Sequence, residues 1–143
     1  MGGKSLGKIV FGIVNPSGKM PITTARSVGQ LIMVYNHKPT NYIHKYAFEK
    51  TKPLYRFGHG LSYTTFSISA PKPSIYTWNG KGSLQVETTV TNTGNMAGTE
   101  TVQLYIRDKF STVTRPVLEL KAYDKIYLQP GAVSYTHLRA HET

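Results

Sequence analysis

LQVETTVTNTGNMAGTETVQLYIRD, residues 84–108, contains two runs in which apolar and polar side chains alternate. Successive side chains of a β-strand point to opposite faces, so a period of two predicts a strand with one buried face. The residues NTGNMAGT (92–99) between the runs favour a turn. The segment therefore predicts two half-buried strands, with these inward side chains: Leu84, Val86, Thr88 and Val90, then Val102, Leu104 and Ile106.

Three further stretches extend this pattern: LELKAYDKIYL (118–128), SYTTFSIS (62–69) and SIYTW (74–78). No helix-period segment interrupts residues 60–130, and turn-forming residues separate the runs. Short strands at this spacing predict an antiparallel β-sandwich. A sandwich of the immunoglobulin or fibronectin kind needs about seven strands, so five predicted strands indicate an incomplete one.

The first half of the chain has a different pattern. KIVFGIV (8–14) fits a helix end or a buried strand, and NPSGKMP (15–21) interrupts regular structure. VGQLIMVY (28–35) is apolar enough to be buried, and residues 36–52 form a long polar loop. The change of pattern near residue 60 predicts an α+β chain that is mainly β.

Charge and composition limit the partners. Seventeen Lys and Arg against seven Asp and Glu give a net charge of +10, which favours acidic partners. The charges are scattered, without a basic helix or an Arg-rich run, so we expect no nucleic-acid partner. No apolar run is long enough to span a bilayer, and no signal peptide is present, so we expect no membrane partner. The absence of cysteine excludes disulfides and thiolate metal sites.

PLYRFGHGLSYTTF (53–66) places four aromatic residues around two glycines. Glycine permits sharp turns, and large aromatic side chains bury much area on either side of a turn. We therefore predict that this motif fastens two parts of the protein together, with a ligand platform as the alternative. The fastener residues are Tyr55, Phe57, Gly58, Gly60, Tyr63 and Phe66.

The last eleven residues, VSYTHLRAHET (133–143), do not continue the sequence pattern of the preceding segment. They resemble the translation of an adaptor used in sequencing libraries, so we expect an artefactual tail, with a genuine tail as the alternative. His137 and His141 have the i, i+4 spacing of zinc ligands but lack a third ligand. We expect no metal site.

Three stretches in this order, residues 11–40, 53–69 and 90–131, resemble glycoside hydrolase family 3, and are most similar to its bacterial periplasmic β-glucosidase type. The sequence departs from the family pattern at Arg56, where proline is common, and at His59, where tyrosine is common. The resemblance implies that residues 1–60 end an α/β sandwich domain. Residues 61–132 would then begin a fibronectin III-like domain that is truncated.

The resemblance also implies a function. The parent protein would be a retaining β-glucosidase, periplasmic or secreted, that removes terminal non-reducing β-D-glucosyl residues from oligosaccharides or glucosides without a cofactor. A β-xylosidase or a parent of mixed specificity is the near alternative. The alternative from another class is a stand-alone carbohydrate- or protein-binding β-sandwich, with Tyr76, Trp78 and Tyr105 as its candidate aromatic strip.

Retaining hydrolysis needs two carboxyl groups about 5–5.5 Å apart. The resemblance implies that both lie upstream of this chain, so we expect no catalytic residue here and an inactive fragment. The chain's own carboxylates are expected to be surface groups: Glu49, Glu87, Glu100, Asp108, Glu119, Asp124 and Glu142. The long loop offers sugar-contacting side chains, against the alternative of a solvated loop: His37, Lys38, Asn41, Tyr42 and His44.

Overall fold

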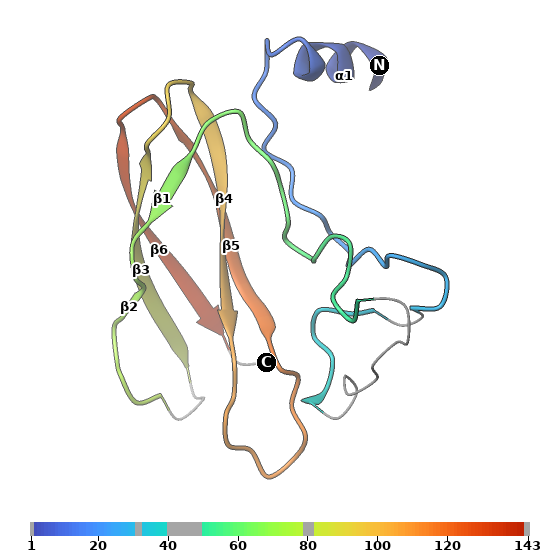
Figure 1. Ribbon diagram of the computed structural model, residues 1–143. Helices are drawn as coiled ribbons and strands as arrows, with labels where there is room; N and C mark the ends of the chain where they lie inside the picture. Colours follow the sequence, from blue (N-terminus) through green and yellow to red (C-terminus); the bar gives the residue numbers. More distant parts are fainter. Residues whose placement is uncertain (1, 31–32, 40–49, 79–81, 142–143) are drawn as a thin grey trace. The chain divides into compact units, whose positions relative to one another are not determined.

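The computed structural model describes residues 2–30, 33–39, 50–78 and 82–141 (Figure 1). These residues form one helix and six strands, which are α1 (Gly2–Val10), β1 (Phe66–Ile68), β2 (Lys72–Pro73), β3 (Ser83–Asn92), β4 (Gly98–Ile106), β5 (Glu119–Leu128) and β6 (Val133–His141). The chain divides into two compact units. Unit 1 comprises residues 1–18, 61–104 and 121–143, and unit 2 comprises residues 19–60 and 105–120.

The strands form two sheets, as the alternating pattern predicted. In the first sheet β3 pairs antiparallel with β1, β2 and β6, and in the second sheet β4 pairs with β5 (Figure 1). Inward side chains of both sheets meet in one cluster, made of Val90, Val102, Ile126, Leu128 and Leu138. Each such side chain contributes about 1.5–3 kcal/mol by leaving water, so this cluster is the core of a β-sandwich.

The predicted faces of β3 and β4 are largely confirmed. Val86, Thr88 and Val90 are buried on β3, and Val102 is buried on β4 with Leu104 packed against the core. A strand was expected near SIYTW (74–78), and the structure places the strand β2 just before it, whereas residues 74–78 have no regular structure. The two-residue β2 pairs with the middle of β3, with Lys72 opposite Glu87.

The alternative left open at KIVFGIV is resolved in favour of a helix end. α1 ends where Gly12 adopts a φ of 72°, a conformation that glycine reaches without strain. The amide of Gly12 donates to the carbonyl of Ile9 (2.9 Å), and that of Ile13 donates to the carbonyl of Lys8 (2.8 Å). This pair of bonds is a Schellman motif, which satisfies the last carbonyls of the helix. Within the described residues, no helix has the length and apolar character needed to cross a bilayer.

The described residues of the apolar stretch VGQLIMVY are only partly buried, unlike the expectation. Val28 is 90% exposed, and the described residues on either side of positions 31–32 have no strand or helix. The buried residue is the polar Gln30, which is 1% exposed. Its Oε1 accepts from the amide of Arg26 (2.7 Å) and its Nε2 donates to the carbonyl of Lys50 (2.5 Å). Two hydrogen bonds compensate the cost of removing this amide from water.

The segment set aside as an artefactual tail is a strand of the sandwich. β6 pairs with β3 from Val133 opposite Thr91 to His141 opposite Ser83. Leu138 and Ala140 are buried, and Leu138 belongs to the core. Residues 133–141 are therefore part of the fold in this structure, whereas the adaptor origin of the segment stays a prediction.

Candidate functional site

Asn15 joins the segment after α1 to the segment that enters the sandwich, within unit 1. Its Oδ1 accepts from the hydroxyl of Ser62 (3.0 Å) and the amide of Tyr63 (2.9 Å), and its Nδ2 donates to the carbonyl of Ala97 (3.3 Å). The Tyr63 hydroxyl donates to the carbonyl of Ile9 (2.8 Å). One amide side chain thus links three segments that are far apart in sequence.

Asn92, the last residue of β3, forms a second junction in the same unit. It is 0% exposed, yet every hydrogen-bonding position of its side chain has a partner. Oδ1 accepts from the Thr64 hydroxyl (2.8 Å) and the Gly94 amide (3.1 Å), while Nδ2 donates to the carbonyls of Met96 (2.9 Å) and Leu128 (3.1 Å). This network holds the entering segment, the turn after β3 and the end of β5 together.

A cluster of aromatic rings forms a third junction, within unit 2. The rings of Tyr35 and Phe57 stack with centroids 4.1 Å apart, and Tyr105 meets Tyr35 edge-on at 6.1 Å. The Leu120 amide donates to the Tyr35 hydroxyl (3.4 Å). Burial, and then the neighbouring Tyr35, raise the pKa of Tyr105 above its usual value. Residues from the first half of the chain therefore pack on the ends of β4 and β5.

The turn through Arg56 and Gly58 has a fixed backbone. The amide of Thr24 donates to the carbonyl of Tyr55 (2.8 Å), and the amide of Leu54 donates to the carbonyl of Thr24 (2.9 Å). Gly58, with a φ of 77°, donates its amide to the carbonyl of Met20 (2.8 Å). Residues 52–59 and Arg26 line an open groove of about 420 Å³ beside this turn.

The predicted fastener residues are divided between the two units, because residues up to Gly60 belong to unit 2 and residues from Leu61 belong to unit 1. Phe57 is half-buried against Tyr35, and Phe66 is half-buried against the sandwich core. Tyr55 and Tyr63 differ from the expectation of burial, because they are 46% and 52% exposed. Their role as a fastener therefore stays a proposal, which these contacts support.

Of the predicted sugar-contacting residues, two lie in the described part of the chain. His37 is half-buried and its carbonyl accepts from the amide of Val117 (2.9 Å), while Lys38 is exposed. Asn41, Tyr42 and His44 lie outside the described residues. The sugar-contacting role of the loop stays a prediction.

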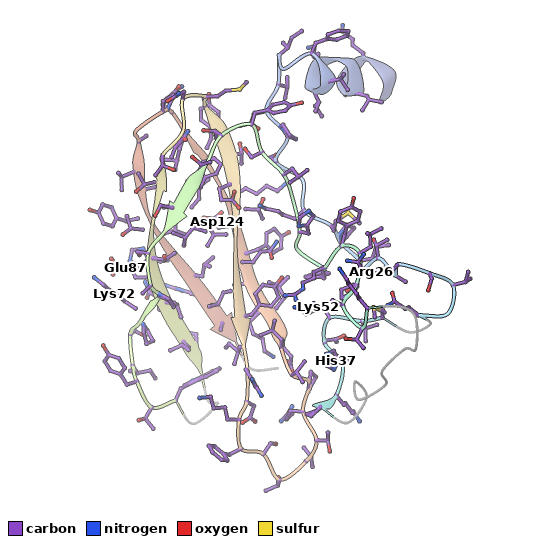
Figure 2. The ribbon with its side chains drawn as sticks, in the orientation of Figure 1. Arg26, His37, Lys52, Lys72, Glu87 and Asp124 are labelled. Carbon is purple, nitrogen blue, oxygen red and sulfur yellow. The ribbon has the colours of Figure 1, made fainter. Side chains whose placement is uncertain are left out.

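The described carboxylates lie on several strands of the sandwich and in the segment after β4. Glu87 on β3 lies opposite Lys72 and 3.9 Å from the imidazole of His137, and Figure 2 labels Glu87 and Lys72 next to each other. The others lie on or after β4 and on β5: Glu100, Asp108, Glu119 and Asp124. Glu49 and Glu142 lie outside the described residues. Among the residues placed by the structure, no three acidic, histidine or cysteine side chains gather as metal ligands.

The candidate aromatic strip of a binding module is not continuous. Tyr76 is 95% exposed, but Trp78 is half-buried and Tyr105 packs against Tyr35. By contrast, sequence reasoning missed the junction residues Asn15 and Asn92. Asn92 is the first residue of NTGNMAGT (92–99), the stretch that favours a turn, and its place at the start of that turn is the available signal.

Comparison with known proteins finds a domain match in each half of the chain. Residues 1–63 match the glycosyl hydrolase family 3 C-terminal domain, and residues 100–141 match a fibronectin type III-like domain. A putative β-xylosidase of Formosa agariphila is 45% identical over 130 residues, which cover 91% of this chain and 17% of that protein. The periplasmic β-glucosidase of Salmonella typhimurium is 41% identical over 140 residues, covering 91% and 18%.

Solved structures of β-glucosidases are also similar to this chain. A β-glucosidase from Erythrobacter marinus superposes with a TM-score of 0.94 at 43% identity, covering 99% of this chain and 19% of that one. A β-glucosidase from Listeria innocua in complex with isofagomine gives 0.90 at 31% identity, covering 99% and 21%. The chain spans about a fifth of the length of these relatives. By these matches the chain is similar to glycosyl hydrolase family 3, with the family's C-terminal domain matched at residues 1–63 and a fibronectin type III-like domain matched at residues 100–141.

Proposed function

We propose that this chain is the C-terminal part of a retaining β-glucosidase that removes terminal β-D-glucosyl residues from oligosaccharides or glucosides. The observation that carries the proposal is the 41% identity, over 91% of this chain, with a protein named periplasmic β-glucosidase. That name also supports a periplasmic or secreted location for the parent protein.

In this proposal the chain supplies structure rather than the reacting groups. A retaining glycosidase needs two carboxyl groups about 5–5.5 Å apart. The described carboxylates lie on β3, on β4, after β4 and on β5. The acid pair then comes from another part of the parent protein, and this chain holds the fibronectin type III-like domain against the family 3 C-terminal domain.

The contacts that support this scaffolding role join the two matched segments. Tyr35 and Phe57, from residues 1–63, pack with Tyr105 and Leu120, from residues 100–141. In unit 1 the hydroxyl of Thr101 donates to the carbonyl of Ser17 (3.3 Å) across the same pair of segments. Phe57 is also one of the predicted fastener residues, so the fastener takes part in these contacts.

A β-xylosidase is the second candidate. Two proteins of Formosa agariphila support it, one named putative β-xylosidase at 45% identity and one named β-xylosidase at 39%. Glucose and xylose have the same pyranose ring, but only glucose carries a C6 hydroxymethyl group. The residues that distinguish the two sugars therefore lie where this group binds. The described residues contain no assigned contact for it.

The experiment compares two proteins. One is the 143-residue chain, and the other is encoded by the whole reading frame that contains it in genomic DNA. Each is given an aryl β-D-glucoside and an aryl β-D-xyloside, and the anomer released first is followed by proton NMR. We expect the whole protein to release β-D-glucose and the 143-residue chain to release nothing. Faster cleavage of the xyloside favours the second candidate, release of the α-anomer contradicts a retaining mechanism, and turnover by the 143-residue chain contradicts the scaffolding role.

A further inference from the structure

The open groove beside the turn at Gly58 is rich in basic residues. Within the part of the chain that the structure describes, its lining includes Arg26, Lys52, Arg56 and His59, and no carboxylate. Figure 2 shows Arg26 and Lys52 in the same part of the molecule, and the Nε of Arg26 donates to the carbonyl of Lys52 (3.0 Å). We propose that this groove binds an oxyanion, namely the carboxylate of a sugar acid or a phosphate group. This site goes beyond the glycosidase activity and does not depend on it.

The charges of the groove are not neutralised from within the described chain. No ion pair joins Arg26, Lys52 or Arg56 to a carboxylate among the residues that the structure places. Like charges gathered around one space repel each other, and the repulsion is relieved when an anion enters. Arginine is well suited to this role because its planar guanidinium matches carboxylate and phosphate oxygens with two parallel bonds.

The backbone that carries these side chains is held before any ligand binds. Two segments run beside each other, because Met20 bonds through its amide to the carbonyl of His59 (2.7 Å) and through its carbonyl to the amide of Gly58 (2.8 Å). Thr24 makes the corresponding bonds with Leu54 and Tyr55. A ligand therefore orders few additional residues on binding, which lowers the entropic cost of association.

The size and lining of the groove favour a small organic anion over a polymer. Its volume of about 420 Å³ lies in the range of small-molecule sites. The ring of Tyr55 stacks on the imidazole of His59, with centroids 5.4 Å apart and planes 23° apart. This pair gives the groove a flat aromatic surface beside its cations, which fits a ligand that has both an apolar ring face and an acidic group.

The test uses the 143-residue chain labelled with ¹⁵N at low ionic strength, titrated with glucuronate, inorganic phosphate and glucose. We expect both anions to shift the amide signals of residues 54–59 in a saturable manner, and glucose, the neutral counterpart of glucuronate, to shift none. Arg56→Gln should weaken anion binding about tenfold, since a hydrogen bond to a charged group is worth about that factor or more. Lys72→Gln is the matched control, because it removes one exposed positive charge from β2.

The following results decide the proposal. Binding of both anions upholds the oxyanion site for both classes of ligand. Binding of glucuronate alone assigns the site to sugar acids, and binding of phosphate alone assigns it to phosphate groups. Equal weakening by Arg56→Gln and Lys72→Gln would overturn the proposal, because it would reflect net charge alone. Binding of glucose as tight as that of glucuronate, or shifts that never saturate, would also overturn it. The dispersion of the amide spectrum checks that each variant is folded.

Discussion

Replacing Asn92 by alanine tests the junction that this residue organises. Its side chain is 0% exposed and makes four hydrogen bonds, two as acceptor and two as donor. Alanine removes all four and leaves the Thr64 hydroxyl and the Leu128 carbonyl without this partner in a buried environment. A hydrogen bond contributes about 1 kcal/mol net, and a buried group left unsatisfied costs about 1–3 kcal/mol. We therefore expect Asn92→Ala to lower the free energy of unfolding by about 4 kcal/mol.

The measurement is urea unfolding followed by fluorescence. The chain has one tryptophan, Trp78, which lies in the same unit as Asn92 and reports on that unit. Asn95→Ala is the matched control, because Asn95 is an exposed asparagine in the turn after β3. It should change the free energy of unfolding by no more than about 0.5 kcal/mol.

If Asn92→Ala fails to fold, a milder variant tests the same hydrogen-bond network. Thr64→Val preserves shape but removes the hydroxyl that donates to Asn92, and it should cost about 1 kcal/mol. In the double variant the costs should fall short of additivity by about 1 kcal/mol, because both substitutions remove the same bond. Equal losses for Asn92→Ala and Asn95→Ala, or full additivity with Thr64→Val, would refute the network as described.

Three further predictions follow from the packing. Gly94→Ala should lower the free energy of unfolding by about 1–3 kcal/mol, measured by urea unfolding, because a Cβ at this position would lie 2.8 Å from the backbone nitrogen of Thr65. Phe57→Ala should cost about 2 kcal/mol through loss of its stacked partner, whereas Phe110→Ala, at 93% exposure, should cost less than about 0.5 kcal/mol. The pKa of Tyr105 is raised in the folded protein, and its contribution to stability is fully present below about pH 10, where tyrosine is neutral in the unfolded chain. This contribution is lost as the pH rises through the pKa of Tyr105 in the folded protein. Tyr105→Phe should therefore flatten the fall of the urea midpoint above about pH 10.

The sandwich was predictable because one physical signal dominates it. A strand that buries one face must alternate apolar and polar side chains, and β3 does so along most of its length. The same signal was absent from β2, whose two residues Lys72 and Pro73 owe their pairing to the neighbouring β3. An artefactual tail is the expectation for the β6 segment, because its sequence differs from the preceding pattern. In the structure its exposed residues Val133, Tyr135 and His137 alternate with residues that are buried or half-buried.

The junctions were less predictable, because their polar side chains are held by partners far along the chain. Asn15 finds its partners at Ser62, Tyr63 and Ala97, and no local pattern encodes such contacts. Gln30 is buried inside a stretch that hydropathy alone assigned to apolar packing. The groove was missed for a different reason. Arg56 was noted as a departure from the family pattern, but its proximity to Arg26 depends on the pairing of residues 20–24 with residues 54–59.

One boundary between the compact units coincides with the change of pattern near residue 60, but each unit contains segments from both sides of it. Unit 2 contains residues 19–60 together with the connection between β4 and β5, so it takes part of the fibronectin type III-like match. Unit 1 contains residues 1–18, which belong to the family 3 C-terminal match, together with most of the sandwich. A cut at residue 60 would separate Phe57 and Tyr35 from Tyr105, and Asn15 from Ser62 and Tyr63. Family boundaries here mark where sequence patterns change, whereas the contacts that stabilise the chain cross that boundary within each unit.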